Sequence, residues 1–209
     1  MLNAIAAGLL AALSAAPSAA APDAPASAKA PAATSVEVAV VTVNGSGCPA
    51  GEGVATLSDE LDVLSIAAPA YFASAGGGAR PTDFRKNCQF SVQISRPAGW
   101  TYAVTQATAG GFTALTQGAT GLSRTSLYFQ GTSPTTALSN TFTGPSVDRW
   151  DTTDTISPAD WSYAPCGTER NLNINTELRV TVAAGAPSNF LIRDPDSSYR
   201  LAWRRCPAV

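Results

Sequence analysis

The chain of 209 residues contains no histidine. Histidine is the commonest general base near neutral pH and the commonest protein ligand of metal ions. Its absence excludes a Ser-His-Asp triad, a Cys-His site and a catalytic zinc ion held by imidazoles. Any enzymatic chemistry would have to use carboxylates, tyrosine, arginine, Lys86 or a hard cation held by oxygen atoms, and we expect no cofactor.

Positive charge is also scarce. Thirteen Lys and Arg residues stand against fifteen Asp and Glu residues, the formal net charge is -2, and the only lysines are Lys29 and Lys86. No basic patch of the kind that nucleic acids require is visible in the sequence, so nucleic acid is excluded as a partner. The length suits one domain, which we expect to be a monomer.

Long hydrophobic runs are missing as well, and the N-terminal one is too short to cross a bilayer. Residues 2–13 are apolar, and several Ala-x-Ala cleavage options follow them. We interpret residues 1–20 as a signal peptide, residues 21–34 as a disordered Ala/Pro-rich linker or propeptide, and residues 35–209 as the folded domain. The mature protein is therefore expected to be secreted and extracellular, soluble, and without a membrane partner.

Four cysteines are present, at positions 48, 88, 166 and 206. An even number of cysteines in an exported chain favours disulfides over free thiols, and zinc sites need close cysteine pairs that this chain lacks. Three pairings are possible. We favour Cys48 with Cys88 and Cys166 with Cys206, because near neighbours in sequence meet most often.

Strict alternation of polar and apolar residues over 171–182 predicts a long strand with one dry and one wet side. Other strands are predicted, between Gly, Pro, Asn or Asp residues, at 35–43, 61–66, 89–95, 100–105, 122–130, 137–143, 190–193 and 199–205. Gly110-Gly111 and Gly144-Pro145 are expected to interrupt regular structure. The fold class is all-β: a single antiparallel β-sandwich, jelly-roll-like or Greek-key, with two disulfides. Its predicted core comprises Val38, Val40, Val92, Ile94, Tyr102, Val104, Leu127, Phe129, Leu172, Ile174, Leu178 and Val180.

Several segments together resemble one known family. They are 44–51 (NGSGCPAG), 81–89 (PTDFRKNCQ), 128–134 (YFQGTSP), 161–167 (WSYAPCG), 170–180 (RNLNINTELRV) and 203–206 (WRRC). The chain is similar to the secreted domain of unknown function 4360 over about residues 36–206. The resemblance implies export and a disulfide framework, and it supplies no activity or catalytic residue.

Candidate metal ligands are Asp148, Asp151 and Asp154, three residues apart in a segment that we expect to be a loop. Oxygen-rich loops of this kind bind calcium, but the spacing fits no EF-hand, and an ordinary turn explains the same residues. Asp194 and Asp196 flank Pro195 and are typical of a Pro-containing turn. We therefore predict no metal.

Paired carboxylates could hydrolyse a glycan without histidine. The candidates for catalytic residues are Glu177, Glu169 and Asp83. An ion pair between Glu177 and Arg179 on the same strand face would explain both residues without chemistry. Asp83 is followed by Arg85 and Lys86, which favours a structural role in pinning the loop.

Three alternating asparagines, Asn171, Asn173 and Asn175, are unusual in a strand. They could form an amide-lined surface for sugar hydroxyls, bordered by Trp150, Trp161 or Trp203. Alternatively they form an ordinary wet sheet face, or cross-strand amide hydrogen bonds. Asn44, in Asn-Gly-Ser, is the only glycosylation acceptor in the chain.

These observations predict a secreted protein that works by binding, to a cell-wall polysaccharide or to another extracellular protein. The competing class is a carboxylate-dependent glycan hydrolase, which requires two carboxylates roughly 5 to 9.5 Å apart across a groove. A third class, a secreted inhibitor or effector, predicts an exposed apolar patch or a protruding loop and no groove.

Overall fold

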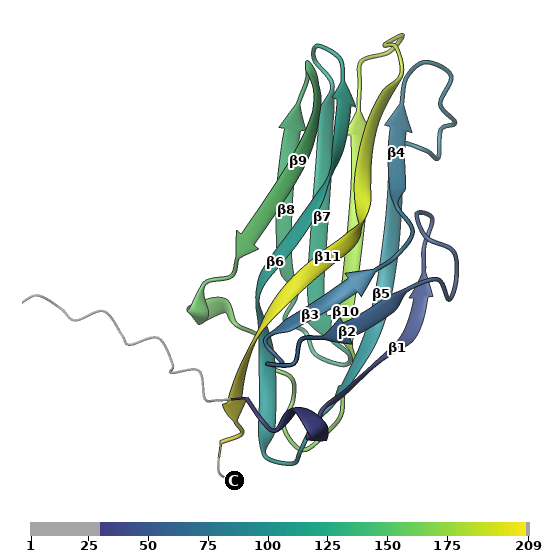
Figure 1. Cartoon of the computed structure of the whole chain (residues 1–209). Helices are drawn as coiled ribbons and strands as arrows, with labels where there is room; N and C mark the ends of the chain where they lie inside the picture. Colours follow the sequence, from purple (N-terminus) through teal and green to yellow (C-terminus); the bar gives the residue numbers. More distant parts are fainter. Residues whose placement is uncertain (1–29, 208–209) are drawn as a thin grey trace, which may run out of the picture.

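The chain folds as two antiparallel sheets stacked face to face, as the computed structural model shows for residues 30–207 (Figure 1). The first sheet has the order β1 (Glu37–Asn44), β5 (Arg85–Ser95), β10 (Leu172–Thr181), β7 (Thr120–Phe129), β8 (Thr136–Thr143). The second has the order β2 (Val54–Leu57), β3 (Val63–Ala67), β11 (Asn189–Arg205), β6 (Trp100–Leu115), β9 (Ser146–Thr155), and β4 (Tyr71–Ala75) also pairs with β11. Two single-turn 3-10 helices, Ala33–Ser35 and Pro158–Asp160, complete the elements. The predicted all-β sandwich is confirmed.

The core fills the space between the two sheets, because each strand turns alternate side chains inward. On β10 the inward residues Leu172, Ile174, Leu178 and Val180 are all buried. Tyr102 packs edge-on against Phe129 of the opposite sheet, with the ring centroids 5.5 Å apart. Of the predicted core, Val38 and Val40 are partly buried at the edge strand, and the rest are buried.

Both favoured disulfides are present. Cys48 is joined to Cys88, which ties the loop after β1 to β5, and both residues are buried. Cys166 is joined to Cys206, which ties the chain ahead of β10 to the end of β11. The first bridge connects parts of the first sheet, whereas the second connects the segment before β10 of the first sheet to the end of β11 in the second sheet, so neither duplicates the other.

The segment of Asp148, Asp151 and Asp154 is strand β9, and the expectation of a loop there is wrong. Its partner β6 runs without a break through Gly110 and Gly111, which we had expected to interrupt it. A Cβ at Gly111 would lie 2.0 Å from the Ile192 carbonyl oxygen and 2.5 Å from the Trp150 ring. Glycine is therefore required there by close packing within the sheet.

Residues Asp194 to Asp196 also belong to a strand. β11 continues from Asn189 to Arg205, and its register against β6 shifts between Arg193 and Ser197. Such a shift marks a β-bulge, where the extra residues leave the hydrogen-bonded ladder and a proline is tolerated. The predicted Pro-containing turn is thus a bulge in the longest strand, which Figure 1 shows running the length of the molecule in yellow.

The predicted signal peptide (residues 1–20) and residues 21–29 of the predicted linker lie outside the described residues. Within residues 30–207, no helix has the length and apolar character needed to cross a membrane.

Candidate ligand-binding face on the first sheet

The outer side of the first sheet is lined by amides and hydroxyls from its three central strands. In register, Asn173 of β10 lies between Ser91 of β5 and Tyr128 of β7, and Asn175 lies between Gln89 and Ser126. We call this surface the amide face; it comprises Gln89, Ser91, Gln93, Ser126, Tyr128, Asn171, Asn173 and Asn175. Sequence reasoning found the asparagines and missed the flanking residues, although Gln89, Ser91 and Gln93 alternate in the same way.

Part of this face is closed by hydrogen bonds between its own side chains. Asn171 Nδ2 donates to Ser91 Oγ over 3.0 Å, and Gln89 Nε2 donates to the Tyr128 hydroxyl over 3.3 Å. The cross-strand amide bonding that we had weighed against sugar binding therefore accounts for Asn171. Asn173, which lies between Ser91 and Tyr128, is only 7% exposed although it points outward.

Asn175 differs from its neighbours because its amide oxygen Oδ1 is buried and accepts no hydrogen bond. It lines a cavity of about 210 Å³ together with Arg85, Asn87, Arg124, Ser126, Thr176 and Glu177. A buried acceptor without a partner costs about 1 to 3 kcal/mol, which a hydrogen bond from a bound hydroxyl would offset. Asn175 thus combines a place in the cavity lining with an acceptor that the protein itself leaves unused.

Glu177 stands at one end of this cavity and is engaged by two arginines. It accepts hydrogen bonds from Arg85 of β5 and, over 2.9 Å, from Arg179 Nη2. Burial alone would raise the pKa of Glu177, but the hydrogen bonds and charges of these two arginines outweigh it and the pKa lies below its ordinary value. Glu177 is therefore an ionised, structurally engaged carboxylate.

The structure does not bring the three catalytic candidates together. Glu169 lies beyond Asn171 at the far end of β10, about 20 Å or more from Glu177 at the usual rise per residue, and it accepts a hydrogen bond from Gln93. Asp83 is held by Arg80 and Lys86. The hydrogen bond from Arg80 has the largest effect and that from Lys86 the next largest, and together they hold the pKa of Asp83 well below its usual range. No facing pair is formed by these residues.

Two of the three tryptophans expected beside the asparagines do not border the amide face. Trp150 and Trp203 are buried between the sheets, and Trp203 Nε1 donates to the Leu61 carbonyl over 2.7 Å. Trp161 is half-buried beside the second 3-10 helix and donates to the Ile156 carbonyl over 2.9 Å. The expected aromatic border is therefore wrong for Trp150 and Trp203, whose large apolar rings contribute to the core, and the aromatic residue on the face is Tyr128.

The aspartates proposed for calcium are divided between the two sides of β9, because side chains alternate along a strand. Asp154 accepts a hydrogen bond from Asn140 of β8 over 2.8 Å, toward the first sheet. Asp151 points to the outer side, where its Oδ1 lies 2.6 Å from the position of a Cβ on Gly110. Residues 30–207 contain no cluster of three or more acidic, histidine or cysteine side chains arranged to hold a metal ion. Asn44, the glycosylation candidate, is exposed at the end of β1.

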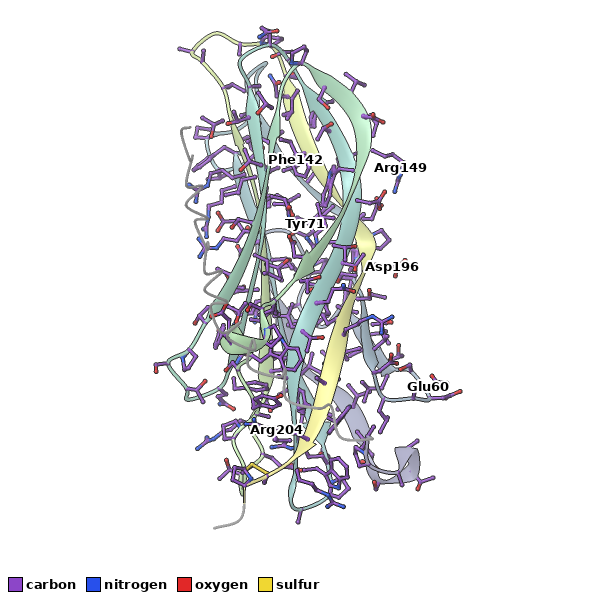
Figure 2. All side chains as sticks on the ribbon, turned by 90° about the vertical axis from the view of Figure 1, so that its left-hand side faces the viewer. Glu60, Tyr71, Phe142, Arg149, Asp196 and Arg204 are labelled. Carbon is purple, nitrogen blue, oxygen red and sulfur yellow. A yellow bond between two sulfur atoms is a disulfide. The ribbon has the colours of Figure 1, made fainter. Side chains whose placement is uncertain are left out.

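A second concave region lies on the outer side of the second sheet. It is a groove of about 680 Å³ whose lining includes Arg149, Asp151, Asp194, Asp196 and Ser197. Figure 2 shows Arg149 and Asp196 projecting from the same side of the sandwich. Asp194 Oδ2 lies 3.2 Å from the Cβ position on Gly110 that Asp151 also approaches, and it pairs with Arg149. The nearest oxygens of the two carboxylates are therefore no more than about 6 Å apart, which brings two acidic side chains together in one groove as carboxylate-dependent hydrolysis requires.

An exposed aromatic pair is present on β4 and β11. Phe72 and Phe190 are both exposed, and their ring centroids are 6.1 Å apart. Val147 of β9 is also exposed. An apolar surface of this kind is the feature that the inhibitor or effector class predicts.

Comparison with known proteins places the chain in a family. The family model described as "Domain of unknown function (DUF4360)" matches residues 34–206, and the chain belongs to that family. An uncharacterized secreted protein of Arthroderma benhamiae is 30% identical over 176 residues, which are 82% of this chain and 72% of that protein. The resemblance seen in the sequence is thus confirmed. The protein is secreted and extracellular, in agreement with its two disulfides.

Two solved structures show a distant likeness. The enzymatically active domain of tailspike protein 4 of bacteriophage CBA120 matches 83% of this chain and 20% of its own chain, at 9% identity and a TM-score of 0.28. This chain thus spans about a fifth of the tailspike chain. A CBM4 structure matches 71% of this chain and 77% of its own, at 15% identity and a TM-score of 0.26. At such TM-scores neither likeness carries a functional argument.

Proposed function

We propose that the protein is a non-enzymatic glycan-binding protein that holds an extracellular polysaccharide on the amide face. The observation that carries this proposal is the buried, unpaired Oδ1 of Asn175, a residue that lines a cavity on this face. Hydroxyl groups are the donors that sugars offer in quantity, and a buried acceptor of this kind gains most from a donor supplied by a ligand.

The chemistry of the surface favours a sugar over a protein partner. Protein interfaces have an apolar core rich in aromatic residues, whereas the amide face presents amides and hydroxyls with Tyr128 as its single aromatic ring. Amide side chains both donate and accept, which matches the dual character of sugar hydroxyls. Tyr128, fixed by Gln89, supplies a ring against which a sugar can pack.

A pull-down on insoluble glycans tests the proposal. We expect the wild-type protein to be retained by at least one glycan and the variant Asn173→Ala plus Asn175→Ala to lose most of that retention. Gln106→Ala is the matched control, because it removes an exposed amide from the second sheet, where Gln106 bonds Thr155. Retention of the double variant at wild-type level, or no wild-type retention on any glycan, would reject the amide face as a glycan site.

A second candidate function is glycan hydrolysis in the groove of the second sheet. It is favoured by one observation, the approach of the Asp151 and Asp194 carboxylates over Gly110 inside that groove. In such pairs one carboxyl group protonates the leaving oxygen while the other attacks the sugar or activates water. Release of reducing ends from a polysaccharide panel, abolished by either Asp151→Asn or Asp194→Asn, would support hydrolysis. Absence of release by the wild type, or release that survives both substitutions, would reject it.

A further inference from the structure

We propose that the cavity beside Asn175 binds an acidic sugar, a uronic acid or a sulfated sugar, within the glycan. This inference rests on the proposed glycan-binding function and adds the charge of the ligand. It is carried by the arrangement of the charged groups around the cavity and by the unused acceptor of Asn175, which lines it.

Three arginines surround one carboxylate at this site. Arg85 and Arg124 line the cavity with Glu177, and Arg179 pairs with Glu177 from the same strand. Glu177 is already the acceptor of both Arg85 and Arg179. The site therefore has an excess of two positive charges, although the whole chain has a net charge of -2.

Arg124 is the arginine without an anionic partner. It is directly opposite Glu177 in the register of β7 and β10, yet no carboxylate within residues 30–207 forms an ion pair with it. Its side chain is exposed at the mouth of the cavity that Asn175 and Ser126 also line. Its guanidinium group thus remains available to a ligand.

The neighbouring acidic groups do not neutralise this excess. Asp83, ahead of β5, is occupied by Arg80 and Lys86. Glu169 and Glu37 lie toward the other end of the sheet, where Glu37 is opposite Ser95. The strand β8 outside β7 has the sequence TALSNTFT and contributes no charge. The positive character is therefore confined to the end of the amide face where the cavity lies.

The ligand chemistry follows from these groups. A planar guanidinium binds a carboxylate or a sulfate through two parallel hydrogen bonds, which is stronger and more directional than a neutral contact. The same sugar can donate a hydroxyl to Asn175 Oδ1. A volume of about 210 Å³ is below the roughly 300 Å³ at which pockets for drug-sized ligands begin. One charged sugar of a longer chain therefore suits the site.

Titration calorimetry of the purified secreted protein tests the inference with four soluble ligands: polygalacturonate, dextran sulfate, a neutral β-glucan and polyglutamate. We expect binding of polygalacturonate or dextran sulfate to exceed binding of the neutral glucan at least tenfold and to weaken as salt rises from 50 to 300 mM. Whichever of the two binds more tightly identifies the acid as carboxylate or sulfate. Polyglutamate, which has charge but no sugar, is expected to bind at least tenfold more weakly.

Variants separate the parts of the site. Arg124→Gln should weaken acidic-glycan binding about tenfold and leave the neutral glucan unchanged, whereas Asn175→Ala should weaken both. Arg200→Gln, on the second sheet and outside both concave regions, is the matched control and should change neither. Thermal unfolding of each variant verifies that it is folded. We expect the melting temperature of Arg124→Gln to match that of the wild type, because Arg124 forms no ion pair within the described residues.

Different outcomes overturn different proposals. Equal affinity for acidic and neutral glycans, or an unchanged affinity of Arg124→Gln, overturns the acidic-sugar inference while glycan binding stands. If polyglutamate binds as tightly as the acidic glycans, the attraction depends on charge alone, and the acidic-sugar inference is also overturned. If no sugar ligand binds, the proposed function itself fails.

Discussion

Arg179 and Glu177 are two residues apart on the same side of β10, and Arg179 Nη2 donates to Glu177 Oε1 over 2.9 Å. The same-face ion pair expected from the strand alternation is therefore present. Arg85 of the neighbouring strand adds a second contact from the other side. Each carboxylate oxygen of Glu177 accepts a hydrogen bond from an arginine, so Glu177 positions the arginines at this end of the amide face. These contacts keep the carboxylate ionised, which does not suit it to act as a proton donor.

The first prediction concerns the pH dependence of stability through Glu177. Its pKa is lower in the folded protein than its ordinary value, so its ionisation stabilises the fold at all pH values above that ordinary value. The stabilisation is lost as the pH falls through the folded pKa. Urea unfolding of the wild type and Glu177→Gln should therefore give a free-energy difference that is constant from pH 8 to 6 and shrinks below about pH 4. A difference that grows on acidification would contradict the lowered pKa.

The second prediction concerns Gly111 at the contact between β6 and β9. Gly111→Ala should destabilise the protein by about 1 to 3 kcal/mol, the usual cost of overpacking, because the new methyl group meets the Ile192 backbone and the Trp150 ring. Gly121→Ala is the control, since its added methyl group meets only Leu191 and Leu115 side chains at 3.3 Å or more. Denaturant midpoints measure both. Equal stability of the two variants would contradict the close packing of the Trp150 ring against Gly111.

The third prediction concerns the disulfides. Each closes a loop with a sequence separation of 40 residues. In the chain-entropy model a loop of this length contributes about 4 kcal/mol. Replacing Cys48 and Cys88 together by alanine should lower the unfolding free energy by about that amount, and replacing Cys166 and Cys206 should do the same. Peptide mapping without reduction checks the pairing, and a Cys48–Cys166 peptide would contradict the fold.

The fourth prediction concerns Arg193, a charged residue inside the sandwich. It is 4% exposed and donates to Ser123 Oγ over 3.3 Å, and within residues 30–207 no carboxylate forms an ion pair with it. Burial raises the pKa of the nearby Tyr71 in spite of the Arg193 charge, so the phenol stays neutral and does not compensate it.

Removing a buried charge in favour of an apolar side chain of similar length is often neutral or stabilising by about 1 to 4 kcal/mol. Arg193→Met should therefore unfold at an equal or higher urea concentration than the wild type. Arg200→Met, at an exposed pair with Asp62, is the control and should change stability by less than about 1 kcal/mol. If Arg193→Met lowered the free energy of unfolding by more than about 2 kcal/mol, the charged side chain would be stabilising the fold and the prediction would be contradicted.

The strands that could be predicted are those in which apolar and polar residues alternate and the apolar ones are buried in the structure. Leu172, Ile174, Leu178 and Val180 alternate with polar residues, and a central strand of a sandwich buries one side of such a pattern. The strands β2 and β4 were missed because each has only four or five residues. The strand β9 was missed because its aspartates and threonines lack an apolar alternation, as suits an edge strand with an exposed side.

The candidate site could be predicted only in part. The asparagines of β10 were visible as a pattern, but the unpaired state of Asn175 depends on Gln89 and Ser126, which come from strands distant in sequence. Trp150 was expected to border the amide surface, whereas its ring is buried in the core against Gly111, where the absence of a side chain leaves room for it. Asp151 and Asp194 approach each other only because β9 and β11 flank the same stretch of β6.

The sequence by itself determined the class of structure, the expectation of export and disulfides, and the exclusion of imidazole chemistry, because composition and the two-residue period act locally along the chain. The tertiary structure alone decided which polar groups are satisfied, where the arginines gather and which carboxylates meet. Those relationships join strands far apart in the sequence, such as those of Arg85 and Glu177, which are separated by 92 positions. Register between strands fixes them, and register is set by packing of the whole sandwich rather than by any one segment.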